Sequence, residues 1–356
     1  MTNKTRVIAM YLPQYHPIPE NDGMWGKGFT EWNNVVKAKP LFPGHYQPKL
    51  PADLGYYDLR LPETREAQAE LAREFGIEGF CYYHYWFAGS RLLERPFTEV
   101  LATGKPDFPF CLCWANESWS GVWVGRPDQI IMEQTYPGPE EHANHFRALL
   151  PAFQDKRYIR IDGKPVFLVY RPMKIPELSA FVLQWQTLAK EAGLPGIYFI
   201  GVNHRNILWE PIQHGFDASV AHRLPDTRPW VSLREPMRWM RHKMQKLLGR
   251  PTIYPYAEVL SKPVFDEPKA GQSYPTVYPN WDTSARHGSK GLVMHNASPE
   301  VFGKQLRAAQ AMVAERSADH RLIFLKSWNE WAEGNYVEPD KITGTQFLEE
   351  IRKAVK

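Results

Sequence analysis

The stretch RLIFLKSWNE, residues 321–330, is a short run of aliphatic and aromatic residues that ends in polar side chains. Runs of this kind and length are typical of buried β-strands. The pattern occurs in seven earlier stretches: VIAMYLPQYH (7–16), IEGFCYYHYW (77–86), PFCLCWANE (109–117), PVFLVYRP (165–172), IYFIGVN (197–203), FDASVAH (216–222) and TVYPNWD (276–282). The sequence therefore predicts eight strands.

Between these runs, apolar residues recur with helical spacing. Ala67, Leu71 and Phe75 are four residues apart. A second apolar face follows the helix-start signal Ser298-Pro299 and consists of Phe302, Leu306, Ala309 and Val313. Strands that alternate with helices favour parallel pairing, and eight such units favour a closed barrel. No linker rich in Pro, Gly or Ser divides the chain, so we expect residues 1–356 to form a single domain, a (β/α)8 TIM barrel of the α/β class with extended βα loops.

The predicted strands end in polar and aromatic residues, which a parallel barrel would gather at its carboxyl-terminal face, where active sites are built. The 13 tryptophans and 17 tyrosines exceed what a core needs, and flat rings with polar groups suit sugar binding. Each residue alone is more often a structural group than a ligand contact. The candidate substrate-binding residues at strand ends are Tyr11, Gln14, His16, His84, Tyr85, Trp86, Trp114, Asn116, Glu117, Asn203, Trp281, Asp282, Trp328 and Asn329; Tyr170, Arg171, His204, His222 and Asn280 share their position.

The segment SWNEWAEG (327–334) places Glu330 and Glu333 between aromatic residues and a glycine. If the chain curls out of the barrel at Gly334, both carboxyl groups can enter one cleft. Two close carboxyl groups cannot both ionise easily, so the pKa of one should rise while the other stays low. Glycoside cleavage requires such a pair. The alternative is that both are solvated loop residues that cap the following turn.

Longer segments resemble known families. EWAEGNYVEP (330–339) is similar to the Glu-Trp-x-Glu-Gly segment of glycoside hydrolase family 99, the endo-α-mannosidase family. YLPQYHPIPENDGMWGKGFTEWNNV (11–35), FCYYHYWF (80–87), CWANESWS (113–120) and SWNEWAEG resemble the WbsX family. Members of that family are described as glycosyltransferases of lipopolysaccharide biosynthesis and carry a family-99-like domain. The likeness to WbsX runs along nearly the whole chain.

The resemblance implies roles for the two glutamates. Glu333 would be the general acid/base, and Glu330 the base that removes the proton of the substrate's 2-hydroxyl. In family 99 that hydroxyl displaces the leaving group through a 1,2-anhydro sugar, which restricts the substrate to manno-configured sugars such as mannose or rhamnose. A role for Glu330 as an ordinary nucleophile is the competing interpretation. Glu31 and Trp32 of FTEW are further candidates, for gripping sugar hydroxyls and for stacking on a ring.

Three functions remain open, each with an oligosaccharide or polysaccharide as partner. The first is a retaining glycosidase or transglycosylase for α-manno-configured linkages of bacterial surface polysaccharide. The second is a glycosyltransferase that builds O-antigen from an activated donor. The third is a non-catalytic barrel that binds glycans.

Residues 223–250 form a basic segment, with eight Lys or Arg against two Asp or Glu. Met237, Met240, Met244, Leu247 and Leu248 follow one helical stripe within it, as in a basic amphipathic helix. One interpretation is a helix packed on the barrel rim with a solvated basic face. The other is docking to anionic lipid or to a lipid-linked glycan. Nucleic acid is not expected, since no reader motif accompanies the charge.

Cofactor and metal motifs are absent from the sequence, which has no G-x-G-x-x-G, P-loop, H-E-x-x-H or Asp-x-Asp, so we expect neither a cofactor nor a metal. Cys81, Cys111 and Cys113 lie in strand-like runs and are expected to be buried thiols without a disulfide. His142 and His145 are expected at the surface of a helix. No signal peptide or membrane span is evident, so we expect a cytoplasmic protein that the basic segment could hold at the inner membrane.

Overall fold

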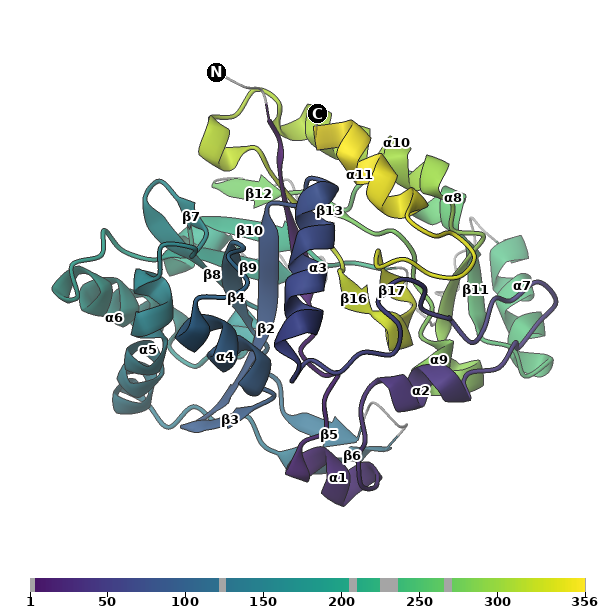
Figure 1. Ribbon diagram of the computed structural model, residues 1–356, viewed down its shortest axis with the longest axis horizontal. Coiled ribbons are helices and arrows are strands. Elements are labelled where there is room, and N and C mark those ends of the chain that lie inside the picture. Colours follow the sequence, from purple (N-terminus) through teal and green to yellow (C-terminus); the bar gives the residue numbers. More distant parts are fainter. Residues whose placement is uncertain (1–3, 122–125, 205–209, 225–235, 266–270, 356) are drawn as a thin grey trace.

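A parallel β-sheet that curls into a nearly closed barrel forms the centre of the fold, in a computed structural model that describes residues 4–121, 126–204, 210–224, 236–265 and 271–355 (Figure 1). The predicted α/β barrel is confirmed. The strands of the barrel are β1 (Arg6–Tyr11), β2 (Gly79–Phe87), β4 (Phe110–Trp114), β8 (Lys164–Val169), β9 (Tyr198–Asn203), β10 (Ala218–Ala221), β12 (Gln272–Tyr274), β13 (Thr276–Val277) and β15 (Leu322–Leu325). Their order is β12-β10-β9-β8-β4-β2-β1-β15-β13, so the first strand lies between the second and the last.

The seventh strand position is split between β12 and β13. β12 pairs with β10 on one side, and β13 pairs with β15 on the other. Pro275 separates the two pieces and cannot donate to a ladder, although its carbonyl accepts from the Phe324 amide at 3.0 Å. The sequence placed this strand at 276–282, and that range is wrong because the ladder begins at Gln272 and ends at Val277. Pro279 follows closely and also lacks an amide proton.

The last strand is also shorter than predicted. β15 ends at Leu325, and the chain then leaves the barrel to form the antiparallel pair β16 (Asn329–Glu330) and β17 (Asn335–Tyr336). A 3₁₀ turn, η6 (Trp331–Glu333), and Gly334 join these two short strands. Both glutamates of the SWNEWAEG segment therefore lie on a hairpin that follows the carboxyl end of β15, rather than on the barrel strand itself.

Helices lie around the barrel and at its carboxyl end (Figure 1). They are α1 (Pro19–Trp25), α2 (Trp32–Lys37), α3 (Pro62–Glu74), α4 (Arg95–Thr103), α5 (Pro139–Gln154), α6 (Leu178–Glu191), α7 (Pro236–Leu247), α8 (Tyr256–Val259), α9 (Ser284–His287), α10 (Pro299–Val313) and α11 (Gln346–Val355). The start of α10 follows the predicted signal, since the Ser298 side chain accepts a hydrogen bond from the Val301 amide. Its predicted apolar face is confirmed, because all four of its residues are fully buried.

The predicted apolar face of helix α3 is confirmed only in part, because Phe75 is buried at its end but its other two residues are not. Ala67 and Leu71 are only half-buried, whereas Gln68, Ala69 and Ala72 are buried. Gln68 faces inward because it accepts a hydrogen bond from Tyr11 Oη at 2.6 Å and donates one to Glu338 at 2.6 Å. Apolar spacing alone misses this face because its central residue is polar.

The remaining strands are β3 (Ser90–Leu92), β5 (Trp119–Gly121), β6 (Arg126–Met132), β7 (Arg160–Ile161), β11 (Thr252–Pro255) and β14 (Leu292–His295). β1 runs downward in Figure 1, so the carboxyl ends of the barrel strands point toward the β5–β6 pair and α1 at the bottom. Cys81, Cys111 and Cys113 are buried thiols in β2 and β4, as predicted. Within the described residues, no helix combines the length and the apolar character needed to cross a bilayer.

Candidate active site

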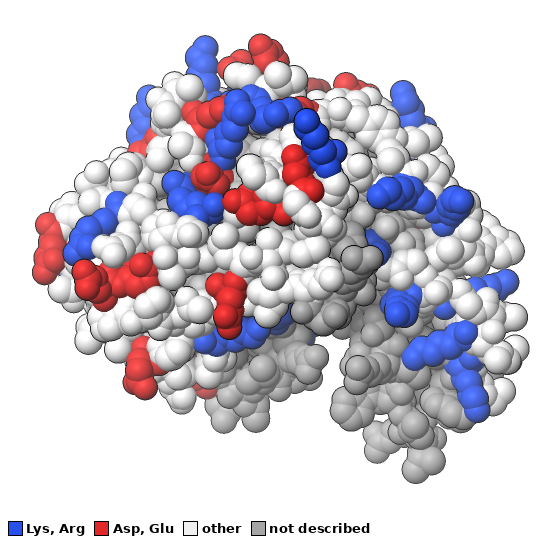
Figure 2. Space-filling view, turned by 90° about the horizontal axis from the view of Figure 1, so that it is seen from below, with Lys and Arg blue, Asp and Glu red and all other residues white. Residues whose placement is uncertain are grey.

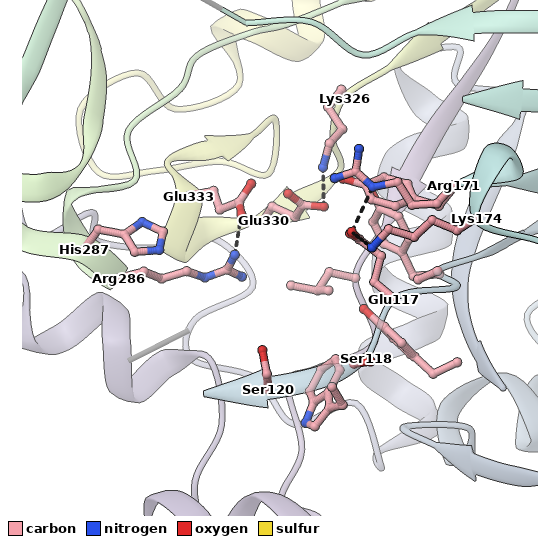
Figure 3. A pocket seen from close by; sticks show the side chains of 16 residues that line it. Glu117, Ser118, Ser120, Arg171, Lys174, Arg286, His287, Lys326, Glu330 and Glu333 are labelled. Atoms are coloured by element: carbon pink, nitrogen blue, oxygen red, sulfur yellow. Dashed lines mark hydrogen bonds and ion pairs between the residues drawn. The ribbon is translucent and has the colours of Figure 1, made fainter. Parts of the chain in front are cut away.

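A cavity of about 490 Å³ opens at the carboxyl ends of the barrel strands (Figure 3). Figure 2 looks onto this end of the molecule and shows acidic and basic side chains gathered close together. The cavity is lined by charged residues, Glu117, Glu330, Glu333, Arg171, Lys174, Arg286 and Lys326, together with Leu12, Tyr83, Tyr85, Ala115, Ser118, Trp119, Ser120, Tyr170 and His287. Aromatic walls with a few convergent charges are the composition of a ligand site.

Glu330 occupies the deep part of this cavity, and its side chain is only 5% exposed. Lys326, at the end of β15, donates a hydrogen bond of 2.5 Å to Glu330 Oε1. Burial raises the pKa of Glu330 to about 7; the positive charge of Lys326 opposes this rise and the nearby Glu333 adds to it. The predicted rise in the pKa of one carboxyl group thus falls on Glu330. The alternative that both glutamates are solvated is wrong for this residue.

Glu333 lies closer to the opening, with its side chain 18% exposed. Arg286 of α9 donates a hydrogen bond to Glu333 Oε1, and Figure 3 shows the two side chains pointing toward each other. The same guanidinium binds Glu31 Oε2 through Nη2 at 2.7 Å and through Nε at 3.0 Å. Although burial opposes its charge, the two carboxylates raise the pKa of Arg286 above its ordinary value. The fully buried Glu31 therefore fixes the position of Arg286, which in turn binds Glu333.

The turn that carries Glu333 ends in a fixed backbone conformation at Gly334. Gly334 adopts a φ of 53°, and a Cβ atom there would lie 2.6 Å from the Cβ of Asp282. The Asp282 amide donates to the Glu333 carbonyl at 2.6 Å. His45 and Gln47 bind the Asp282 carboxylate at 2.8 and 2.7 Å. A glycine is required at this position, and Asp282 supports the turn from behind.

Residues near β1 hold the other side of the hairpin. Asn329 Oδ1 accepts from the Leu12 amide at 2.8 Å, and its Nδ2 donates to the Leu12 carbonyl at 3.0 Å. Tyr15 Oη donates to the Asn329 carbonyl at 2.6 Å and accepts from the Trp331 amide at 3.0 Å. Trp331 Nε1 donates to Glu338 at 2.6 Å. Burial raises the pKa of Glu338 to about 7, against the lowering effect of its hydrogen bonds. The hairpin is thereby bound to the first strand of the barrel.

Of the predicted site residues, Glu330, Glu333, Tyr85 and Glu117 line the cavity. Glu31, Asp282 and Asn329 lie behind it and hold its walls, as described above. Asn116 is buried next to the cavity and donates through Nδ2 to the Arg171 carbonyl at 2.9 Å. The structure therefore brings together residues from distant strand ends, although several of them support the cavity without lining it.

Strand alternation decides which residues of β2 face the cavity. Tyr83 and Tyr85 point into it, whereas His84 and Trp86 point outward against α5. His84 Nε2 lies 2.8 Å from His145 Nε2, and the Trp86 ring stacks on His145. The prediction of a surface His145 is wrong, because this side chain is buried among aromatic rings. Burial lowers the pKa of His84 to about 3 and that of His145 well below its ordinary value.

The other predicted residues lie outside this cavity. Trp32 Nε1 donates to the Tyr57 carbonyl at 2.8 Å, and Trp114 Nε1 donates to the Trp86 carbonyl at 3.2 Å. Trp281 lines a separate cavity of about 190 Å³ that also contains Asp282. The remaining buried residues of this group are Tyr11, Gln14, His16, Asn203 and Trp328.

Sequence reasoning missed several lining residues as site candidates. Tyr83 is two positions before Tyr85 and could have been found from the strand period. Lys326 directly follows the apolar run of β15, at a strand end. Ser118, Trp119 and Ser120 lie within the CWANESWS segment, and Lys174 follows the strand end at Arg171. Arg286 and His287 come from a four-residue helix with no signal in the sequence. No cluster of three His, Cys, Asp or Glu suited to a metal occurs among the described residues.

Comparisons with known proteins agree with this architecture. The sequence pattern of the family described as "Glycosyltransferase WbsX" matches residues 7–351. Two proteins from strains of Xanthomonas campestris pv. campestris, each described as "Uncharacterized protein WxcX", are 39% identical to this chain over 98% of its length. The chain spans about half of their length, 49%.

Two solved structures share the fold. One, a "Glycoside hydrolase-like protein", superimposes with a TM-score of 0.64 at 15% identity and covers 100% of this chain and 95% of its own. The other, the GH99 endo-α-mannosidase from Bacteroides thetaiotaomicron, has a TM-score of 0.57 at 15% identity and covers 100% and 97%. At this identity the likeness shows the fold alone.

Proposed function

Because this chain belongs to the WbsX glycosyltransferase family, we propose that its cavity carries out chemistry at a glycosidic bond, as a retaining glycosidase or transglycosylase. One observation carries the proposal: Glu330 and Glu333 reach a single cavity from the same short turn, each held by a different cation. Paired carboxyl groups in unequal surroundings are what glycoside cleavage requires.

The resemblance of EWAEG to glycoside hydrolase family 99 suggests the roles of the two groups, and their positions are compatible with it. Glu333, on the more open side, protonates the leaving oxygen and later activates the incoming water or sugar hydroxyl. Glu330, deep in the cavity, removes the proton of the 2-hydroxyl, which then displaces the leaving group to form a 1,2-anhydro sugar. When the water or sugar hydroxyl attacks C1 and opens this ring, Glu330 returns its proton to O2. A pKa of about 7 suits Glu330 to proton transfer near neutral pH.

This chemistry restricts the substrate. The 2-hydroxyl must lie trans to the leaving group, as it does in α-mannosides and α-rhamnosides. Tyr83, Tyr85, Trp119 and Tyr170 offer rings on which the faces of such sugars can stack. We therefore assign the substrate class as α-manno-configured linkages of bacterial surface polysaccharide.

The test is cleavage of a panel of α-mannan and α-rhamnan oligosaccharides, with products read by mass spectrometry and anomeric form by NMR. Cleavage with retention, lost in Glu330→Gln and in Glu333→Gln, is expected. Glu117→Gln is the matched control, because Glu117 lines the same cavity on the opposite side (Figure 3). Cleavage that survives in both variants at the rate of the wild type would refute the proposal, and Glu330-dependent cleavage would exclude a barrel that only binds glycans.

A transferase is the second candidate, favoured by the family description and by two cations at the cavity wall. Arg171 and Lys174 lie beside Glu117, with side chains 32% and 60% exposed, and two positive charges against one carboxylate suit a phosphate leaving group. A product that forms only when an activated sugar donor is added, with no cleavage of any oligosaccharide, would establish this function instead.

A further inference from the structure

Helix α7 exposes four apolar residues of the predicted stripe; the side chain of Met237, its fifth member, lies outside the described part of the chain. Met240, Met244, Leu247 and Leu248 are spaced so that they lie on one face, at the end of the helix and just beyond it. Their exposed fractions are 58, 55, 80 and 57%. A helix of a globular protein normally buries such a face. Burial on the barrel rim, one of the two arrangements considered from the sequence, is therefore wrong for these four residues.

Among the described side chains of α7, the polar Gln245 contacts the neighbouring strand β11. Gln245 Oε1 accepts from the Ile253 amide at 3.2 Å, and Gln245 Nε2 donates to the Ile253 carbonyl at 3.5 Å. These hydrogen bonds hold α7 against the backbone of β11, while Met240, Met244, Leu247 and Leu248 are exposed.

The exposed apolar face is flanked by positive charge. Lys243 and Lys246 are exposed, and Arg250 is half-exposed. The sequence from Pro236 to Ala257 contains five Lys or Arg and no Asp or Glu. Figure 2 agrees with this: on the visible face of its right-hand lobe, where α7 lies, the described residues show basic side chains and no acidic ones. Part of the basic segment, residues 225–235, lies outside the described residues.

We propose that α7 is an interfacial helix that docks the protein on an anionic membrane surface. An exposed apolar stripe next to Lys and Arg is the composition that lies in the boundary between headgroups and acyl chains. The apolar side chains enter the bilayer, while the basic side chains contact lipid phosphates. A second copy of the chain fits this face less well, because it would bring like charges together. The proposal is independent of the reaction in the cavity.

Co-sedimentation with vesicles tests the proposal. The protein is mixed with vesicles of phosphatidylcholine alone and with vesicles that also contain phosphatidylglycerol. The wild type should bind the anionic vesicles at least about tenfold more tightly, and added salt should weaken this binding. Equal binding to both vesicles, or none, would overturn the proposal.

Matched variants separate this helix from the rest of the surface. The double change Met244→Ser and Leu247→Ser should weaken binding by about tenfold or more, because it removes apolar groups that enter the bilayer. Lys246→Gln should weaken it about fivefold. The controls are Leu183→Ser and Lys190→Gln on α6, since both residues are exposed there and should leave binding unchanged. The proposal is wrong if the α6 variants lose vesicle binding to the same extent. It is also wrong if the α7 change leaves vesicle binding intact and only dissociates a dimer in analytical ultracentrifugation.

Discussion

The surroundings of Glu330 and Glu333 are built from different parts of the molecule. The cation beside Glu330 is Lys326, which directly follows barrel strand β15. The cation beside Glu333 is Arg286, which comes from the short helix α9 and is held by Glu31 near the start of α2. The barrel itself therefore sets the charge environment of the deep group, whereas loops set that of the outer group. Because Glu333 contributes to the raised pKa of Glu330, sequence changes in the loops that move Glu333 would also act on Glu330.

The largest effect should come from exchanging either glutamate for glutamine. Both changes should lower kcat/KM on unactivated glycosides by a factor of about 10²–10⁴, the usual contribution of proton transfer. Aryl glycosides with an acidic phenol need no proton on the leaving group, so they should restore part of the rate in Glu333→Gln but not in Glu330→Gln. Steady-state rates over a series of aryl leaving groups check this. If the aryl glycosides restored the rate of Glu330→Gln instead, Glu330 would be the general acid and Glu333 the base.

Glu338 can be compared with Glu330, because burial raises the pKa of each to about 7. Lys326 donates a hydrogen bond to Glu330, whereas only neutral groups donate to Glu338. The folded chain then binds this proton more tightly than the unfolded chain does. The stabilisation from protonating Glu338 is complete at low pH and is lost as pH rises from about 4.5 to about 7, by roughly 3 kcal/mol. Urea unfolding across this interval should show that slope.

Glu338→Gln should flatten the slope, since the group no longer titrates. The contrast with Glu330→Gln, measured the same way, separates the contributions of the two buried acids. An unchanged slope in Glu338→Gln would mean that this residue is ionised in the folded protein throughout the interval.

Lys326→Met should shift the pH dependence of activity. The ammonium group lowers the pKa of Glu330, so its removal should raise that pKa above about 7. Glu330 must be ionised to act as a base, and the acidic limb of the kcat/KM profile should move up by at least about one pH unit. The loss at neutral pH would be about tenfold, and activity should return at higher pH. Lys326→Arg keeps the charge and should leave the limb in place; the same shift in both variants would argue against a charge effect.

The smallest effect is expected at Glu117. Its ion pairs with Arg171 and Lys174 are partly exposed, and such pairs contribute about 0–1 kcal/mol. Glu117→Gln should therefore change kcat/KM by less than about fivefold and the unfolding free energy by less than about 1 kcal/mol. A much larger loss of activity would break the contrast between this glutamate and the other two, and would place Glu117 in the reaction.

The barrel could be predicted because most of its strands, such as β2, β4 and β8, are largely apolar runs, and the location of the site followed from where those runs end. Which side chains enter the cavity was harder to foresee. On β2 the outward-facing His84 and Trp86 are as polar or aromatic as the inward-facing Tyr83 and Tyr85, because the outer layer of helices supplies its own partners, His145 and Glu141. Composition at a strand end does not distinguish the two faces; only the strand register does.

Arg286 could not be predicted for a different reason. Its place depends on a four-residue helix whose position is set by contacts with residues far away in the sequence, such as Glu31, 255 positions earlier. The sequence also could not show whether the apolar face of α7 is buried or exposed, since an apolar stripe has the same pattern in both cases. Only the exposed fractions in the structure decide between these arrangements.

The pairing of Asn329 with Leu12 spans 317 positions of the chain. During synthesis, the Leu12 amide and carbonyl cannot form their hydrogen bonds with Asn329 until nearly the whole barrel has left the ribosome. The same holds for the hydrogen bonds of Tyr15 Oη with the backbone of Asn329 and Trp331. The hairpin that carries Glu330 and Glu333 can make these contacts only after β1 and the residues that follow it are in place. The barrel of a nascent chain therefore lacks both the hairpin contacts and the pairing of β15 with β1 until almost the last residues are made.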